Sequence, residues 1–282
     1  MDAPSPRSLI LDLLSTLRHG TMPVAALLEA GEVFGLASGS LRVALARLLA
    51  SQRVERDERG RYRLGPRAAP MRGAVGRWRK LDELRVAWDG RWWGVQQSRP
   101  IPRNGRRAHE QSLRLHGFQT LTRELSLRPA NRSGGTPALR SSLTKLGLDS
   151  GAFVSRLDEL DAPTEARARE LWQPQHLLAS YRTSLAQVEA SAARLASLSE
   201  QAAMRESFLL GGRVIQQLVL DPLLPAEIVD PTDRDALVAS MRRYDRLGRT
   251  AWAGLLARYA VPHIATPADS GFAQRSARLD AA

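Results

Sequence analysis

Residues 36–49 read Leu36-Ala37-Ser38-Gly39-Ser40-Leu41-Arg42-Val43-Ala44-Leu45-Ala46-Arg47-Leu48-Leu49. Apolar residues recur in this stretch at the spacing i, i+3, i+4, i+7, which predicts one short amphipathic helix with a shared buried face. The residues on that face are Leu41, Ala44, Leu45 and Leu48. Ser38 is expected to cap the start of the helix, because a serine hydroxyl can accept a backbone N–H hydrogen bond there.

The opposite face of this predicted helix is cationic and carries no acidic residue. It consists of Ser40, Arg42, Val43, Ala46 and Arg47. Such a face fits the major groove of DNA, where an arginine can bind guanine through two hydrogen bonds or contact a phosphate. An ordinary surface helix with two solvated arginines explains the same pattern, so the neighbouring sequence has to separate the two interpretations.

The flanking sequence predicts a winged helix-turn-helix over residues 1–66. Residues 8–17 and a segment that begins at Pro23 have helical apolar spacing, and glycines follow both. Residues 53–57 and 61–64 then read as two short strands joined by a turn at Glu58-Arg59-Gly60. A basic hairpin directly after a cationic helix is typical of a wing.

Eight residues are therefore the expected DNA contacts. The helix supplies Ser40, Arg42, Val43 and Arg47, and the wing supplies Arg59, Arg61, Tyr62 and Arg63. The arginines of the wing suit phosphates or a minor groove, while Tyr62 is expected to pack inward or to donate to a phosphate.

The distribution of charge supports a polyanionic partner. The chain of 282 residues has a formal net charge of +12. Residues 1–80 hold 14 basic residues against 7 acidic ones, residues 81–133 hold 10 against 5, and residues 134–282 hold 17 against 17. Arginine-rich codon usage would raise the basic content, but it would not concentrate the excess in one half. A basic half joined to a neutral half suggests a DNA-binding module attached to a sensing or assembly module.

Composition also narrows the class of protein. The chain has no cysteine, which excludes disulfides and thiolate sites and agrees with a reducing compartment. It has no apolar run long enough for a membrane span and no signal-peptide pattern at its start. We therefore expect a cytoplasmic, nucleoid-associated protein without a membrane partner.

The rest of the chain is predicted to form a linker, two further domains and a tail, which makes the fold α+β and helix-rich. Residues 67–87 read as a linker helix, and residues 88–158 follow the order β-α-β-β-α-β of a ferredoxin-like domain. Residues 159–262 read as an all-α effector or dimerisation domain, in which Gly211-Gly212 suggests a bend or a close helix–helix contact. Residues 263–282 read as a disordered tail.

A basic loop opens the first helix of the middle domain. It contains Arg99, Arg103, Arg106 and Arg107 among prolines and a glycine. Arginines near a helix start can hold an anion, so these four are candidate effector-binding residues. The anion could be a DNA phosphate or the phosphates of a coenzyme A thioester, and a solvated loop is the third alternative. His109 and His116 can share a helix face, but no third metal ligand stands near them.

Four segments together resemble the phenylacetate-operon repressor family (PaaX). They are Ala44-Leu45-Ala46-Arg47-Leu48, Arg61-Tyr62-Arg63-Leu64, Trp88-Asp89-Gly90-Arg91-Trp92 and Leu218-Val219-Leu220-Asp221-Pro222-Leu223-Leu224-Pro225. The resemblance covers nearly the whole chain. It implies a bacterial transcriptional repressor, released by phenylacetyl-coenzyme A or a related metabolite, whose middle domain is similar to small CRISPR-associated nucleases. The chain departs from the family at Asp230-Pro231-Thr232-Asp233, which leaves the identity of the effector open.

The similarity to nucleases raises an enzymatic alternative. Such a nuclease needs an aspartate near the end of its first strand to hold Mg²⁺. Here the strand that starts at Trp92 runs into Ser98-Arg99-Pro100, and Asp89 lies before it. We therefore expect no catalytic residue, metal or cofactor.

The sequence thus favours a DNA-binding transcriptional regulator of an aromatic-acid catabolic operon. Its expected partners are double-stranded operator DNA, an aryl-acyl-coenzyme A effector and a second copy of the chain. The homodimer is expected because one small helix buries too little surface for specific binding, whereas a two-fold dimer reads two half-sites. A metal-dependent nuclease and a non-specific architectural DNA-binding protein are the alternatives.

Overall fold

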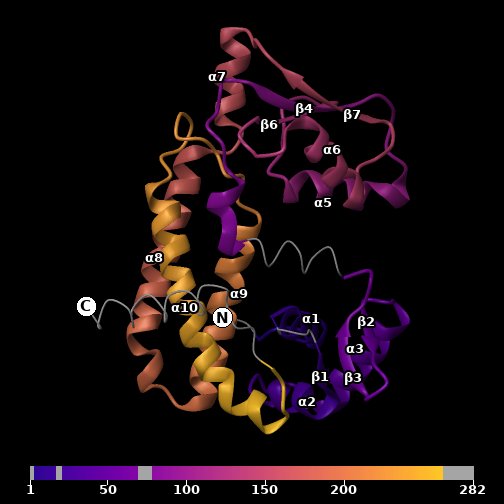
Figure 1. The fold of residues 1–282 in the computed structure, drawn as a ribbon, viewed down its shortest axis with the longest axis vertical. Coiled ribbons are helices and arrows are strands. Elements are labelled where there is room, and N and C mark those ends of the chain that lie inside the picture. Colours follow the sequence, from indigo (N-terminus) through magenta and orange to yellow (C-terminus); the bar gives the residue numbers. More distant parts are fainter. Residues whose placement is uncertain (1–2, 17–20, 69–77, 263–282) are drawn as a thin grey trace, which may run out of the picture. The chain divides into compact units, whose positions relative to one another are not determined.

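The computed structural model describes residues 3–16, 21–68 and 78–262, which form a helix-rich α+β protein (Figure 1). It has two small antiparallel sheets and a helical C-terminal region. The chain divides into two compact units. Unit 1 takes in the described residues up to 68 together with 195–209 and 245–262, and unit 2 takes in 78–194 and 210–244. None of the helices in the described ranges is long and apolar enough to span a membrane.

The N-terminal part of unit 1 is a group of three helices with a three-stranded sheet. Its elements are α1 (Pro6–Thr16), β1 (Met22–Pro23), α2 (Val24–Glu32), α3 (Ser38–Ala50), β2 (Val54–Arg56) and β3 (Arg61–Leu64). The strand order is β1-β3-β2, so β3 is central and pairs with both neighbours. The two-residue strand β1 was not predicted from the sequence.

The predicted amphipathic helix is α3, and its two faces differ as expected. Leu41, Leu45 and Leu48 are buried in the core of unit 1, and Ala44 is half-buried. The predicted serine cap is wrong. Ser38 is the first helical residue, and Ala37 takes the N-cap position without any side-chain hydrogen bond. The reason is geometric, because the N-cap residue needs an extended backbone and Ala37 has φ −63° and ψ 134°.

Helices α2 and α3 approach each other closely at a glycine. A Cβ atom built on Gly31 would lie 2.1 Å from Cδ1 of Leu41, which is far inside van der Waals contact. Leu41 is itself buried in the core of unit 1, where close packing limits how far a side chain can shift. The absence of a side chain at Gly31 therefore fixes how deeply Leu41 sits and how α3 lies on α2.

The ends of two C-terminal helices complete the core of unit 1. They belong to α9 (Glu200–Val219) and α10 (Thr232–Arg258). The ring of Phe34, just after α2, lies 5.1 Å from that of Phe208, which lies 5.8 Å from that of Trp252. Beside this aromatic cluster, the carboxylate of Glu29 accepts hydrogen bonds from the Arg258 guanidinium and, at 2.6 Å, from the Tyr259 hydroxyl. The three-helix group is thus held by segments from the opposite end of the sequence.

Unit 2 contains a four-stranded antiparallel sheet with the strand order β5-β6-β4-β7. Its elements are β4 (Trp92–Gln97), α5 (Arg103–Leu115), β5 (Gln119–Thr120), β6 (Leu125–Pro129), α6 (Gly135–Lys145) and β7 (Ala152–Leu157). The order along the chain is the β-α-β-β-α-β that the sequence predicted. Side chains from β4, β7 and α6 form one core cluster, which includes Trp93, Leu143 and Val154.

The helical part of unit 2 follows the sheet. It consists of α7 (Ala162–Glu170), α8 (Pro174–Arg194) and the inner portions of α9 and α10. Helix α7 was not predicted. Helix α9 continues through Gly211 and Gly212 as one helix. Gly211 allows the close helix contact that was one of the two alternatives for this pair, since a Cβ there would lie 3.5 Å from Cε of Met241.

The predicted linker, C-terminal helical domain and tail can be compared with the described residues one by one. The linker helix over residues 67–87 lies partly outside the described residues, and the described part holds a short 3-10 helix, η1 (Trp78–Leu84). The segment 159–262, predicted as one helical domain, contributes to both units. The predicted tail over residues 263–282 lies outside the described residues.

The contact between Gly31 and Leu41 predicts that a methyl group added at residue 31 lowers the stability of the fold. We expect Gly31→Ala to lower the free energy of unfolding by about 1–3 kcal/mol, because overpacking outweighs the gain in helix propensity. The matched control is Gly212→Ala, an exposed mid-helix position with no atom within 4 Å of the new methyl. That variant should gain about 1 kcal/mol. Urea unfolding of both variants measures the difference, and a stabilised Gly31→Ala protein would contradict it.

The hydrogen bonds to Glu29 predict a pH-dependent contribution to stability. The Tyr259 hydroxyl and the Arg258 guanidinium lower the pKa of Glu29 below its ordinary value of 4.5. A lowered folded-state pKa stabilises the fold above that ordinary value, and the stabilisation is lost as the pH falls through the folded-state pKa. Glu29→Gln should therefore melt at a lower temperature than wild type at pH 7, and the difference should shrink as the pH falls below 4.5. Glu32→Gln, on the same helix, is the control and should track the wild type throughout.

Candidate nucleic-acid interface

The exposed face of α3 carries all four DNA-binding residues predicted for this helix. Ser40, Arg42, Val43 and Arg47 are all exposed. Val43 keeps 52% of its surface accessible, which is high for an apolar side chain. In the part of the chain that the structure describes, neither Arg42 nor Arg47 forms an ion pair, and α3 itself contains no acidic residue. The face therefore presents two uncompensated guanidinium groups on either side of an exposed valine.

The β2–β3 hairpin is shaped by one aspartate in its turn. The Oδ1 atom of Asp57 accepts hydrogen bonds from the backbone N–H groups of Arg59 (3.0 Å) and Arg61 (2.7 Å). Gly60 has φ +73°, a conformation in which a side chain would be strained. Together these features turn the chain tightly and leave Arg59 exposed at the tip.

The remaining residues of the predicted wing differ in how far their side chains are exposed and free to contact DNA. Arg61 is half-buried, and Tyr62 packs against the core of unit 1, as one of its two predicted alternatives required. Arg63 is exposed, but its guanidinium lies 3.0 Å from Oε2 of Glu55 on the neighbouring strand. Exposed ion pairs of this kind contribute little to stability, so a phosphate can compete with Glu55 for Arg63.

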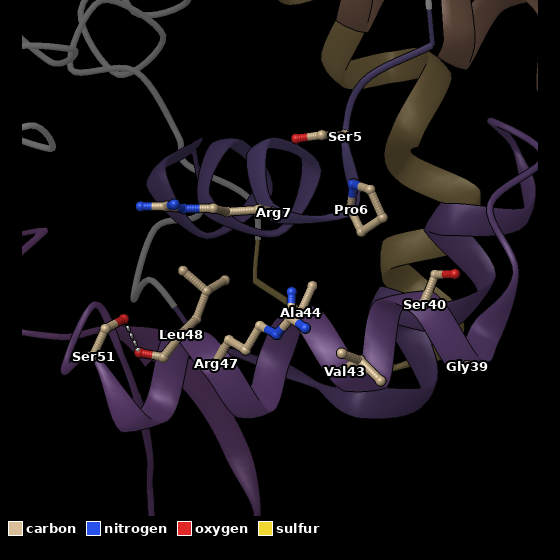
Figure 2. A pocket seen from close by; sticks show the side chains of 10 residues that line it. All are labelled: Ser5, Pro6, Arg7, Gly39, Ser40, Val43, Ala44, Arg47, Leu48 and Ser51. Atoms are coloured by element: carbon tan, nitrogen blue, oxygen red, sulfur yellow. Dashed lines mark hydrogen bonds between the residues drawn. The ribbon is translucent and has the colours of Figure 1, made fainter.

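A groove runs between the first turn of α1 and the exposed face of α3 (Figure 2). Its volume is about 680 Å³. It is lined by Ser5, Pro6, Arg7, Gly39, Ser40, Val43, Ala44, Arg47, Leu48 and Ser51. Three of the predicted DNA contacts (Ser40, Val43 and Arg47) belong to this lining. Arg7 does too, although no sequence signal marked it, because only the packing of α1 on α3 brings residues 7 and 47 to the same groove.

The predicted effector-binding arginines lie on an exposed segment. Arg99 donates to the hydroxyl of Ser150 at 3.0 Å, and Arg103, Arg106 and Arg107 follow in the first turns of α5, all of them exposed. None of the four lines the cavity of about 290 Å³ in unit 2, which is bordered by other residues that include Trp93, Arg132 and Arg156. The role of the four arginines stays a prediction.

His109 of α5 and His116, directly after this helix, are held inside unit 2. His116 is buried, and its ring nitrogens lie 2.8 Å from the carbonyl oxygen of Ser112 and 2.8 Å from the hydroxyl of Ser142. His109 accepts a hydrogen bond at 3.3 Å from the backbone N–H of Asp149, and burial lowers its pKa. Among residues 3–16, 21–68 and 78–262, no group of three or more His, Asp or Glu side chains has the arrangement of a metal site.

The Asp221-Pro222-Leu223-Leu224-Pro225 segment is a structural centre of unit 2. Asp221 is buried, and it accepts hydrogen bonds from the Tyr181 hydroxyl (2.6 Å) and from the backbone N–H of Leu223 (2.7 Å). Burial raises its pKa, and the charge of Arg234 and the Tyr181 hydrogen bond oppose that shift. The carbonyl oxygen of Leu223 in turn accepts from Asn131 at 2.6 Å. The segment thus joins helix α8 to the loop after β6.

A fully buried arginine next to this segment donates to neutral acceptors among the described residues. Arg128 donates to the carbonyl oxygens of Pro129 (3.0 Å) and His116, and to the side-chain oxygen of Asn131 (2.8 Å). Its guanidinium also lies 5.7 Å from the ring of Trp93. These groups satisfy the donors of the charge without a carboxylate, so Arg128 serves packing within unit 2.

The Trp88-Asp89-Gly90-Arg91-Trp92 segment is likewise structural. The indole of Trp92 donates to Glu165 of α7 at 2.7 Å, and its ring lies 5.3 Å from that of Trp88. Arg91 pairs with Asp89 at 3.1 Å and also with Asp158. The segments 88–92 and 221–225, two of the four that resemble a repressor family, therefore stabilise unit 2, and neither lines the groove beside α3.

Comparison with known proteins gives a likeness of fold. No protein-family model and no curated protein matches this chain. Among solved structures, the chain is similar to the uncharacterized protein Rv0674 from Mycobacterium tuberculosis, with a TM-score of 0.59 and 20% sequence identity. The match covers 91% of this chain and 99% of that one. At this identity the likeness concerns the fold alone.

Proposed function

We propose that this chain is a DNA-binding transcriptional regulator in which α3 reads the major groove. The observation that carries the proposal is the exposed face of α3, where Arg42, Val43 and Arg47 stand without any acidic neighbour on the helix. The next two strands form a basic hairpin, so residues 6–64 are interpreted as a winged helix-turn-helix.

The dimensions and chemistry of α3 suit this role. A helix of 13 residues is about 20 Å long, and the major groove of B-DNA admits one helix. Arg42 can pair with guanine through its N7 and O6 atoms, and Val43 can contact the methyl group of thymine. Gly39 has no side chain and Ser40 a small one, which leaves space for the close approach that such contacts require.

The charge of the chain supports binding to a duplex. The formal net charge is +12, and the excess of basic residues lies before residue 134. Electrostatic attraction to phosphates supplies most of the non-specific affinity of DNA-binding proteins and makes that affinity fall steeply with salt. The hairpin arginines, in this interpretation, contact the backbone that flanks the groove occupied by α3.

The finer assignment follows from the family resemblance of the sequence. We propose a repressor of the phenylacetate-operon (PaaX) type, with a ferredoxin-like domain over residues 88–158, a homodimeric assembly and an acyl-coenzyme A effector. The repressor would bind two half-sites, and the effector would favour a dimer whose α3 helices no longer match their spacing. The likeness to Rv0674 supports a shared fold and carries no information on operator or effector.

The role of Arg42 can be tested by comparing two duplexes. One is the best sequence selected from a random library, and the other is a random duplex of equal length. Arg42→Ala should weaken binding to the selected duplex by roughly 1–3 kcal/mol and binding to the random one much less, because a base contact is lost. Arg123→Ala, an exposed arginine of unit 2 outside every candidate site, is the control. Equal losses on both duplexes would show that Arg42 does not read bases.

Two substitutions in the hairpin are expected to change the affinity for DNA in opposite directions. Arg61→Ala should weaken binding to both duplexes and lower the slope of log K against log salt by about one. Glu55→Gln should strengthen binding roughly two- to fivefold at low salt, because it releases Arg63 and removes a negative charge. Fluorescence anisotropy titrations at several salt concentrations measure both effects. Weaker binding by Glu55→Gln would place the hairpin away from the DNA backbone.

A further inference from the structure

The groove between α1 and α3 points to a DNA contact that lies outside the helix-turn-helix and the hairpin. We propose that this groove binds a phosphate of the DNA backbone through the side chains of Arg7 of α1 and Arg47 of α3. The inference rests on the proposed function and adds a new residue and a defined subsite to it. Arg7 lies in the first turn of α1, far in sequence from every other candidate contact.

The lining of the groove suits a phosphodiester. It contains two arginines, three serines and no acidic residue. Its remaining side chains are small or apolar, and a Cβ atom built on Gly39 would meet nothing within 4 Å, so the wall formed by the start of α3 is open. The volume of about 680 Å³ leaves room for a backbone segment between the helices (Figure 2).

The two arginines are available for an outside anion. Both are exposed, and neither side chain forms an ion pair or hydrogen bond within the described residues. Two other arginines of unit 1 are engaged, since Arg63 pairs with Glu55 and Arg258 pairs with Glu29. Two unpaired guanidinium groups along one open groove form a site for negative charge, since arginine binds phosphate oxygens through paired N–H donors.

The groove is expected to bind DNA because it shares residues with the exposed face of α3. Ser40, Val43 and Arg47 belong both to the groove and to the exposed face of α3. When a helix enters the major groove, the two phosphate backbones lie along its flanks. A duplex read by Val43 therefore brings one backbone to the flank where Arg47 and Arg7 lie. Phosphate contacts of this kind fix the register of a recognition helix without reading sequence themselves.

The contact can be tested with single phosphates neutralised on the selected duplex. A series of duplexes, each with one methylphosphonate in place of a phosphate, is titrated with wild type and with Arg7→Ala. We expect Arg7→Ala to bind both selected and random duplexes roughly tenfold more weakly, with a salt slope lower by about one. We also expect one methylphosphonate position to weaken the wild type but to have no further effect on Arg7→Ala. Arg123→Ala serves again as the charge-matched control, and Arg7→Lys should recover part of the loss.

The outcomes separate this inference from the proposed function. A wild-type chain that binds no duplex overturns the proposed function. A wild-type chain that binds DNA while Arg7→Ala keeps its affinity, salt slope and methylphosphonate profile overturns only the phosphate subsite. Protection of Arg7 from arginine-modifying reagents by millimolar inorganic phosphate, but not by the duplex, would assign the groove to a small anion and overturn the inference as well. Arg7 is exposed, and unchanged circular dichroism and melting temperature of the variants exclude misfolding as the cause.

Discussion

The close approach of α2 and α3 at Gly31 and Leu41 is the constraint on which the rest of unit 1 depends. The missing side chain at Gly31 lets Leu41 sit against the backbone of α2, and Leu45 and Leu48 follow it into the core. Once this side of α3 is buried, helical geometry leaves the arginines and Val43 on the other side. Core packing thus decides which face of α3 is exposed. The side chains on that face do not hold the core together, so they can be suited to a binding partner.

Unit 1 and unit 2 use different interactions to hold their helices. In unit 1 an aromatic cluster and the hydrogen bonds to Glu29 tie α2 to the ends of α9 and α10. In unit 2 buried polar groups meet at Asp221 and Arg128, and each finds several partners, as buried charges require. Both α9 and α10 contribute residues to both units, so the proposed DNA-binding helices are packed on segments that continue into the proposed regulatory half.

The sequence predicted α3, the hairpin and the order of elements over residues 92–157, because their signals are local. Apolar periodicity places a helix or strand and shows which side is buried. It does not show what covers that side, so the part played by Phe208 and Trp252 in unit 1 could not be predicted. Helix α7 was not predicted, although Asp161 caps it, because its sequence is rich in charged residues and shows no large apolar residues at helical spacing. Arg7 was missed for a different reason, since no spacing rule connects it with Arg47.

Selection of duplexes from a random library by the full-length chain tests the central proposal most directly. A regulator that reads bases with α3 should enrich one motif, made of two related half-sites about one helical turn or a multiple of it apart. The enriched duplex should bind at least about a thousandfold more tightly than the starting library at physiological salt. Enrichment of no motif, with selected and random duplexes bound equally, would contradict sequence-specific regulation. Binding to neither would remove DNA as the partner of the α3 face.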